Sequence, residues 1–401
     1  MSRRPTCRTP HATSAAVVLL VLVAAPRHAA AQQTVMDILS FLLTNRSVAT
    51  GAPVQDEQAA NATRDTFSHL LLSELATLPI SSSSAGFTYR IEETAGGVPV
   101  RSSNSFGPFF LERSLTAGTL QVSLGGSYRD TSFGTIDGRD IRGGTLPAIA
   151  SRLQGEPEPF DVETLSLRLR TRTFTATGNI GVTDRLDVSG AIALVRLDLS
   201  GSRTDVLRGT PFVQANAAVT ASGIGDSIVR AKYHLLRYGA SGVAVALETR
   251  IPTGDSANLL GAGKAAYRPR VIGSLELNQL AVHGEAGYSF GGLSRELNYG
   301  AAVTVAAANR LTLVGEVLGK RLETMGRLTD VVTPHPNLIG VETIRLTTLQ
   351  EPTQRLMAVG GVKWNPGATW LVSANVFRPL LSAGLSAGWV SAIAMEYSFG
   401  G

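Results

Sequence analysis

Cysteine and long apolar runs are both scarce in this sequence of 401 residues. Cys7 is the only cysteine, and it lies in an N-terminal segment that we expect to be removed. The mature chain would then hold no disulfide bond, no thiol nucleophile and no thiolate metal site. Beyond that segment, no stretch reaches the roughly 18 to 20 apolar residues that a transmembrane helix needs. Charged residues make up only 17% and hydrophobic residues 44%, which is typical of a β-barrel in which every second strand residue faces lipid.

The chain also lacks a strong charge of either sign. It has 36 Lys and Arg against 31 Asp and Glu. Four basic residues, Arg3, Arg4, Arg8 and Arg27, lie within residues 1–31, so 32 basic residues face 31 acidic ones after that segment is removed. No basic block or tail is present, and we therefore expect no nucleic-acid partner.

Residues 1–31 have the parts of a secretory signal peptide. Three arginines give a positive start, residues 15–25 form an unbroken apolar run, and residues 29–31 (AAA) supply a small-residue cleavage site. We expect cleavage before Gln32 and export by the general secretory route.

From residue 118 to residue 399, segments of roughly ten to fifteen residues alternate apolar and polar side chains, as transmembrane strands do. We predict strands at residues 118–130, 161–182, 186–200, 223–237, 242–252, 268–277, 280–290, 297–307, 311–320, 352–364, 368–378 and 388–399. Short and long connections alternate, and the longest are predicted at 131–160, 201–222 and 321–351. The predicted fold class is all-β: residues 118–399 form a transmembrane antiparallel up-and-down β-barrel of about 12 strands, with a partly helical N-terminal extension.

Two of these strands lose their alternation part-way along, near Phe174 and near Val195. A β-bulge would produce this loss of phase. A strand that reaches beyond the membrane would produce it as well.

Residues 32–117 have a different pattern. Apolar residues recur at helical spacing in residues 35–43 and 64–78, and Pro79 ends the second helix. We expect this helical and irregular segment to lie in the periplasm or inside the barrel as a plug. For the helix at 64–78, a dimer contact and a periplasmic partner site are alternatives, because its apolar face has to be buried.

Side-chain phase assigns one face of each strand to lipid and the other to the lumen. The candidate lumen-lining residues are Arg230, Lys232, His234, Glu248, Arg250, Glu276, His283, Glu285 and Glu316. The same inner face is assigned to Arg168, Arg170, Arg172, Lys363 and Glu396. These charges either form a polar lumen that selects solutes or holds a plug, or pair with one another and fill a narrow barrel. Pairing is expected in the second case because an unpaired buried charge costs several kcal/mol.

Other chemistries have less support from the sequence. His234, His283 and Glu285 share the inner face, but two histidines on strands not shown to be neighbours are weak evidence for a metal site. Residues 225–228 (GDSI) resemble the motif around the nucleophilic serine of certain esterases, with Ser227 as nucleophile, but the Asp-x-x-His of those enzymes is absent. A lipase that uses a serine at the lumen edge with either histidine stays open, since it leaves no local motif. We predict no catalytic residue, no cofactor and no metal.

A set of turn and strand residues carries a family resemblance. The residues are LETRIPTGD (247–255), Gly-Ala-Gly (261–263), Pro269 and HGEAGY (283–288). They resemble the outer-membrane proteins of the phenol-degradation MetA-pathway family, which in turn resemble hydrophobic-compound channels of the long-chain fatty acid transporter type. The resemblance covers about residues 173–399 and leaves out residues 106–142. It implies a porin-like or channel-like role and brings no catalytic residues.

The predicted function is an outer-membrane channel or transporter for small hydrophobic or aromatic molecules, not an enzyme. One alternative is a sealed structural or docking barrel whose loops or N-terminal segment bind a partner. Another is an outer-membrane enzyme that modifies lipid. The expected partners are outer-membrane lipid, a small-molecule solute and the outer-membrane assembly machinery, which reads a C-terminal strand with alternating apolar residues such as Tyr397 and Phe399.

Overall fold

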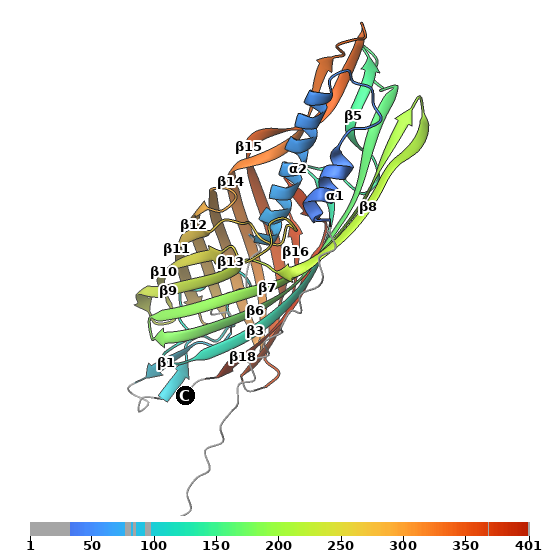
Figure 1. The fold of residues 1–401 in the computed structure, drawn as a ribbon. Coiled ribbons are helices and arrows are strands. Elements are labelled where there is room, and N and C mark those ends of the chain that lie inside the picture. Colours follow the sequence, from blue (N-terminus) through green and yellow to red (C-terminus); the bar gives the residue numbers. More distant parts are fainter. Residues whose placement is uncertain (1–32, 77–81, 83–85, 93–97, 368, 400–401) are drawn as a thin grey trace, which may run out of the picture. The chain divides into compact units, whose positions relative to one another are not determined.

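The computed structural model contains an antiparallel barrel of twelve strands (Figure 1). The structure describes residues 33–76, 82, 86–92, 98–367 and 369–399, so the expected signal peptide lies outside the described residues. The barrel strands are β3 (Val122–Ile136), β6 (Asp161–Thr183), β7 (Leu186–Leu207), β9 (Ser227–Tyr238), β10 (Ser241–Ile251), β11 (Ala266–Leu277), β12 (Leu280–Gly291), β13 (Glu296–Ala308), β14 (Leu311–Pro334), β15 (Val341–Trp364), β16 (Trp370–Pro379) and β18 (Val390–Phe399). The last strand, β18, pairs with the first, β3, which closes the sheet. The predicted fold class is confirmed.

Two-residue turns join neighbouring barrel strands at one end of the barrel, which we call the turn end, and the other end is the loop end. Asn278 and Gln279 alone join β11 to β12, and Asn278 has a φ of 54°, a conformation that asparagine adopts more readily than most residues. β3 begins and β18 ends at the turn end, because Val122 pairs with Phe399. This is the arrangement that the alternation of short and long connections indicates.

Four further strands extend the sheet at the loop end, where the sequence predicts long connections. They are β4 (Arg139–Asp140), β5 (Leu146–Leu153), β8 (Thr210–Ile224) and β17 (Leu385–Ala387). Arg208 and Gly209 join β7 to β8 in a two-residue turn with φ values of 48° and 82°, as tight hairpins require. The connections predicted at 201–222 and 321–351 are therefore largely strand. Separately, β1 (Tyr89–Glu92) and β2 (Val98–Arg101) form a two-stranded hairpin.

The hydrophobic alternation of β6 inverts part-way along the strand. Toward the turn end, the outward residues Phe174 and Ile180 are apolar and exposed. Toward the loop end, the inward residues Leu167 and Leu169 are buried, and the outward residue Arg170 is polar and exposed. The pairing of β6 with β7 keeps one register throughout this stretch. The loss of phase therefore comes from a strand that continues beyond the apolar band, not from a bulge.

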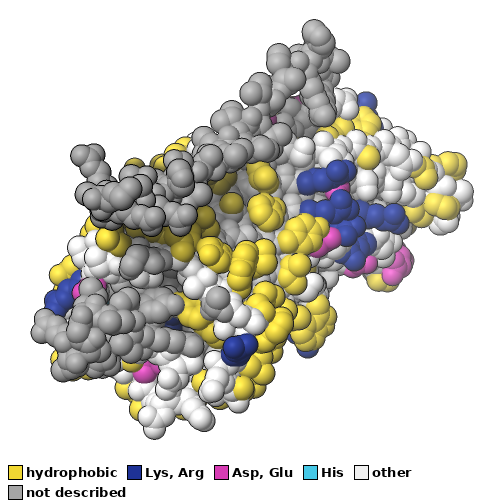
Figure 2. Space-filling model, turned by 90° about the horizontal axis from the view of Figure 1, so that it is seen from below, with side chains coloured by type: hydrophobic (Ala, Val, Ile, Leu, Met, Phe, Trp, Pro, Cys, Tyr) yellow, Lys and Arg dark blue, Asp and Glu magenta, His cyan; other side chains and the backbone are white. Residues whose placement is uncertain are grey.

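The prediction that Arg168, Arg170 and Arg172 face inward was wrong. They lie on the outer face, where Arg170 and Arg172 pair with Asp130, and the Arg170 side chain is 49% exposed. Figure 2 shows a group of basic side chains beside acidic ones on the surface, with hydrophobic side chains covering much of the face around it. Outside the apolar band the outer solvent is water, so charged residues replace apolar ones on the outer face.

Two helices fill the loop-end half of the barrel. α1 (Val35–Leu43) is where the sequence predicts it, and Thr34 caps its start. α2 (Pro53–Ala76) begins eleven residues before the helix predicted at 64–78, and the predicted end at residue 78 lies outside the described residues. Among the described residues, no helix combines the length and the apolar character needed to cross a bilayer.

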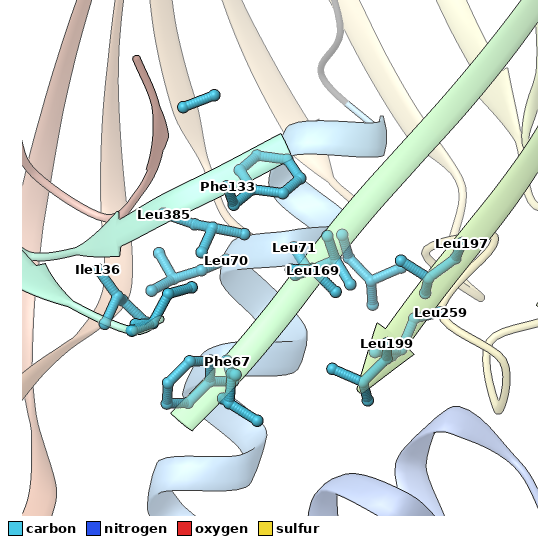
Figure 3. Close-up of a cluster of buried hydrophobic side chains, with 14 of the residues drawn as sticks. Phe67, Leu70, Leu71, Phe133, Ile136, Leu169, Leu197, Leu199, Leu259 and Leu385 are labelled. Carbon is cyan, nitrogen blue, oxygen red and sulfur yellow. The ribbon is translucent and has the colours of Figure 1, made fainter. Parts of the chain in front are cut away.

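The apolar face of α2 is buried against the inner faces of the barrel strands. Phe67, Leu70 and Leu71 of α2 belong to one cluster with Phe133 of β3 and Leu385 of β17 (Figure 3). Each of these five side chains is at most 4% exposed. Burying them stabilises the loop-end half as a packed core, which explains why the strands can be apolar on the inside there.

Candidate functional site

Residues 103–119 form an irregular segment inside the turn-end half of the barrel. Hydrogen bonds attach its first and last residues to strands or turns near the turn end. Ser103 Oγ donates a hydrogen bond of 2.9 Å to Glu276 Oε2, beside the β11–β12 turn. Thr119 Oγ1 donates one of 2.6 Å to Asp184 Oδ1, in the β6–β7 turn. We call residues 103–119 the inner segment.

The middle of the inner segment is held by a network of buried ion pairs. The Glu112 carboxylate, which is fully buried, pairs with Arg230 and lies 3.3 Å from Lys232 Nζ. Arg230 Nη2 lies 2.6 Å from Glu248 Oε2, and Arg270 Nη2 lies at the same distance from that oxygen. Buried charges are tolerated when they are paired in this way, so this network fixes the inner segment against the wall of β9, β10 and β11.

A second carboxylate anchors the apolar part of the inner segment. Glu316 accepts hydrogen bonds from the backbone N–H groups of Phe109 and, at 3.2 Å, Phe110. Lys363 Nζ donates one of 2.8 Å to the carbonyl oxygen of Pro108. The backbone next to Phe110 is therefore fixed on both sides, while the Phe110 ring projects from it.

The nine predicted lumen-lining residues lie on the inner face of the barrel. Seven are buried, namely Arg230, Lys232, His234, Glu248, Arg250, His283 and Glu316, and two are partly buried, namely Glu276 and Glu285. The ion-pair network brings Arg230, Lys232 and Glu248 together, and Arg270 links them to Glu285 at 3.3 Å. Whether these residues line a passage remains a prediction.

The structure does not bring the two candidate histidines together. His234 lies on β9 and His283 on β12, with β10 and β11 between them. His283 Nδ1 is 2.9 Å from Ser274 Oγ, so the ring is held by a neighbouring strand. Ser227, the candidate esterase nucleophile, is the first residue of β9, and its backbone N–H donates to Thr253 Oγ1 at 2.9 Å.

Cavities lie in series along the inner wall formed by β3, β6, β16 and β18. The first, which we call the loop-side cavity, lies next to Leu75 of α2. The second, the turn-side cavity, shares Arg129 with the first. A third shares Thr177 and Glu396 with the second and reaches Asn179, near the β6–β7 turn. Neighbouring cavities thus share lining residues from the helical core down to the turn end.

Small side chains make this space. Gly125 and Ser127 of β3, Thr175 of β6, and Ala392 and Ala394 of β18 line the turn-side cavity. The opposite wall carries the long charged side chains of the ion-pair network, and a further cavity lies against them, lined by Arg230, Glu248 and Arg270.

Two aromatic rings separate these cavities. Phe110 lines the turn-side cavity and a fourth cavity, and that fourth cavity shares Lys320, Arg355 and Met357 with the loop-side cavity. Phe377, which lines the loop-side cavity, meets the Phe110 ring edge-on at 5.8 Å between centroids. A shift of the Phe110 ring would therefore join the spaces around it.

Several residues of the site were missed by the sequence predictions. Arg129 and Arg270 fall in predicted strands, in phase with other inward residues, so alternation alone could have identified them. Glu112 and Phe110 lie in the inner segment, which has no regular periodicity, and no sequence signal identifies their role.

Comparison with known proteins places the chain in a family. The family described as "Putative MetA-pathway of phenol degradation" matches residues 111–322, more than half of the chain. The chain belongs to this family. The match includes part of residues 106–142, which the resemblance seen in the sequence leaves out, and it ends before the C-terminal strands.

Solved structures with similar folds are distant in sequence from this member of the MetA-pathway family. The translocator domain of autotransporter NalP from Neisseria meningitidis is 11% identical, covers 70% of this chain and 89% of its own, and has a TM-score of 0.36. OprB from Pseudomonas putida, in a low-pH structure, is 10% identical, with coverage of 70% and 91% and a TM-score of 0.25. OmpT, an outer membrane protein of Vibrio cholerae, is 9% identical, with coverage of 71% and 99% and a TM-score of 0.29. Similarities this distant carry no information about function, and a search of curated proteins found no match.

The residues that resemble the MetA-pathway family form a clasp at the loop end. Asp226 accepts hydrogen bonds from the backbone N–H groups of Gly254, at 3.2 Å, and Ala262, at 2.8 Å. A Cβ atom on Gly261 would lie only 2.6 Å from Gly254 Cα, so the two glycines permit this close approach. The motif therefore shapes the connection between β10 and β11, which explains why it does not identify a solute.

Proposed function

We propose that this protein is an outer-membrane channel through which small hydrophobic or aromatic molecules cross along the inner wall of β3, β6, β16 and β18. The observation that carries the proposal is the series of cavities that share lining residues past the inner segment. Apolar side chains such as Phe377 and Leu385 line the loop-side cavity, and small side chains together with Lys363 and Glu396 line the turn-side cavity. An apolar solute leaves water for this wall without disturbing the buried ion pairs opposite.

The Phe110 ring is the gate in this proposal. Its backbone is fixed through Glu316, so opening requires a change of side-chain rotamer and not release of the whole inner segment. The ion pairs of Glu112 then keep the inner segment in place while solutes pass beside it.

The proposal also sets the place and orientation of the chain. Residues 1–31 are removed on export, the apolar band contacts outer-membrane lipid, and the turn end faces the periplasm, as short turns do in such barrels. Tyr397 and Phe399 of β18 are exposed on the outer face, where the assembly machinery reads the C-terminal strand.

Uptake of N-phenyl-1-naphthylamine tests the proposal. This apolar aromatic probe becomes fluorescent once it has passed the lipopolysaccharide layer, which slows its passage in a Gram-negative host that lacks general porins. Cells that produce the protein should take it up faster than vector cells, with no gain in xylose uptake.

Two tryptophan variants provide the matched comparison. Ala394→Trp narrows the turn-side cavity, whereas Ala374→Trp adds the same ring to the exposed outer face of β16. Ala394→Trp should abolish the gain in uptake and Ala374→Trp should keep it, with both proteins folded by heat-modifiable gel mobility. Equal uptake by the two variants would overturn the proposed route.

The ion-pair network favours a second candidate function, a sealed barrel that docks a partner. The ion pairs of Glu112 hold the inner segment against the barrel wall, as expected for a plug that stays in place permanently. Folded wild-type protein that gives no uptake above vector cells would select this candidate.

A further inference from the structure

Arg129 is a buried cation on β3. It lines both the loop-side and the turn-side cavity and is 8% exposed. Among the residues that the structure describes, no side chain forms a hydrogen bond or an ion pair with its guanidinium. The guanidinium faces the ring of Phe377, with 5.6 Å between Cζ and the ring centroid. Because burial of an uncompensated charge is costly, this position is suited to an anion that arrives from outside the chain.

The two other cations of the loop-side cavity face a carboxylate. Arg355 pairs with Glu74 of α2, and Lys320 Nζ lies 4.0 Å from the same carboxylate. The lining thus holds three basic side chains and one acidic one, and Arg129 is the basic side chain of this lining that pairs with no carboxylate in it.

The rest of the lining is mainly apolar. It includes Leu75, Phe133, Met357, Phe377, Leu385 and Val390. Two buried hydroxyl groups, those of Thr131 and Thr171, lie beside Arg129 along β3 and β6, which pair at these residues. The cavity therefore combines one cationic end, two hydroxyl groups and an apolar body.

We propose that the loop-side cavity binds a small monocarboxylate whose body is an aromatic ring or a short hydrocarbon. The guanidinium of Arg129 presents a planar fork that matches two carboxylate oxygens. The apolar body packs against Phe133 and Phe377. The inference rests on the proposed channel function for its role, because the bound molecule is the solute that passes.

The charge balance selects this class over others. A neutral apolar molecule would leave Arg129 uncompensated, whereas one carboxylate pairs with its guanidinium. A sugar would place many hydroxyl groups against apolar side chains, where they lose hydrogen bonds to water.

Equilibrium dialysis of the full-length protein in a non-ionic detergent tests the proposal with three labelled probes at neutral pH. Benzoate has both the charge and the ring, benzamide has the ring alone, and acetate has the charge alone. We expect benzoate to bind about tenfold or more tightly than either of the others. Equal affinities for benzoate and benzamide, or for benzoate and acetate, would overturn the proposal.

Variants assign the charge preference to one residue. Arg129→Gln should lose the preference for benzoate over benzamide, and Arg129→Lys should restore part of it. Arg168→Gln, on the exposed outer face, is the matched control and should bind as the wild type does. An unchanged preference in folded Arg129→Gln protein would contradict the assignment.

The outcomes separate this inference from the proposed function. If the protein takes up the neutral probe N-phenyl-1-naphthylamine but shows no preference for benzoate, the channel proposal stands and the carboxylate-site proposal is wrong. If the protein prefers benzoate but gives no uptake, the carboxylate site stands, the channel proposal is wrong, and the barrel is sealed.

Discussion

The ring of Phe110, on the inner segment, meets the ring of Phe377, on β16, edge-on with 5.8 Å between their centroids. This contact stands where the loop-side, turn-side and fourth cavities come together. In the proposed channel, these two side chains, one from the inner segment and one from the wall, control whether the cavities are continuous.

Removing the Phe110 ring should open the barrel. We expect Phe110→Ala to raise uptake of N-phenyl-1-naphthylamine several-fold, because the fixed backbone stays in place and only the ring is lost. Phe290→Ala, on the exposed outer face of β12, removes the same ring away from the lumen and should leave uptake unchanged. Unchanged uptake in Phe110→Ala would show that this ring is not the gate.

Neutralising Glu112 should weaken the fold. Glu112→Gln leaves Arg230 and Lys232 with one carboxylate fewer in a buried site, and breaking a buried pair costs about 3 kcal/mol. We expect a lower midpoint of unfolding in guanidinium. Glu156→Gln, in an exposed connection, is the control and should leave the midpoint unchanged. An unchanged midpoint in Glu112→Gln would show that the network contributes nothing to stability.

Removing the charge of Arg129 should have the opposite effect. Arg129→Met replaces an uncompensated buried cation by an apolar side chain of similar length. We therefore expect the free energy of unfolding, measured without ligand, to rise by about 1 kcal/mol or more. Arg168→Met, at an exposed position, should change it by less than about 0.5 kcal/mol. A loss of stability in Arg129→Met would mean that the cation has a structural role.

The clasp at the loop end should matter for stability and not for the choice of solute. Asp226→Ala leaves the backbone N–H groups of Gly254 and Ala262 without their acceptor, and a buried unsatisfied group such as the Ala262 N–H costs about 1 to 3 kcal/mol. We expect less folded protein by heat-modifiable gel mobility, with the preference for benzoate over benzamide retained in the folded fraction. A changed preference would place the clasp in the binding site.

The strands of the barrel could be predicted from sequence because each lies between two contrasting environments. Where lipid lies outside and a polar lumen inside, outward Phe174 and inward Lys232 stand out by phase. Beyond the lipid band the inside becomes an apolar core around α2 and the outside becomes water, so the phase inverts. The inversion is why the sequence pattern places Arg170 on the wrong face and predicts loops where β14 and β15 extend at the loop end.

The site itself could be predicted only in part. Phase alone placed Glu248 and His283 on the inner face, since it needs no knowledge of neighbouring strands. The partners of these residues could not be predicted, because they come from the irregular inner segment. Nothing local in the sequence around Glu112 or Phe110 indicates that a distant strand contacts it.

The central claim is passage along the inner wall of β3, β6, β16 and β18. Its most direct test is a reversible block of uptake at Ser127, which lines the turn-side cavity. Cells that produce Ser127→Cys take up N-phenyl-1-naphthylamine before and after modification with a benzyl methanethiosulfonate, and again after a membrane-permeant reductant. Ser391→Cys, on the exposed outer face of β18, is the control. We expect uptake to fall on modification of Ser127→Cys and to return on reduction, with no change in Ser391→Cys. Unchanged uptake in Ser127→Cys protein that mass spectrometry shows to be fully modified would contradict passage along this wall.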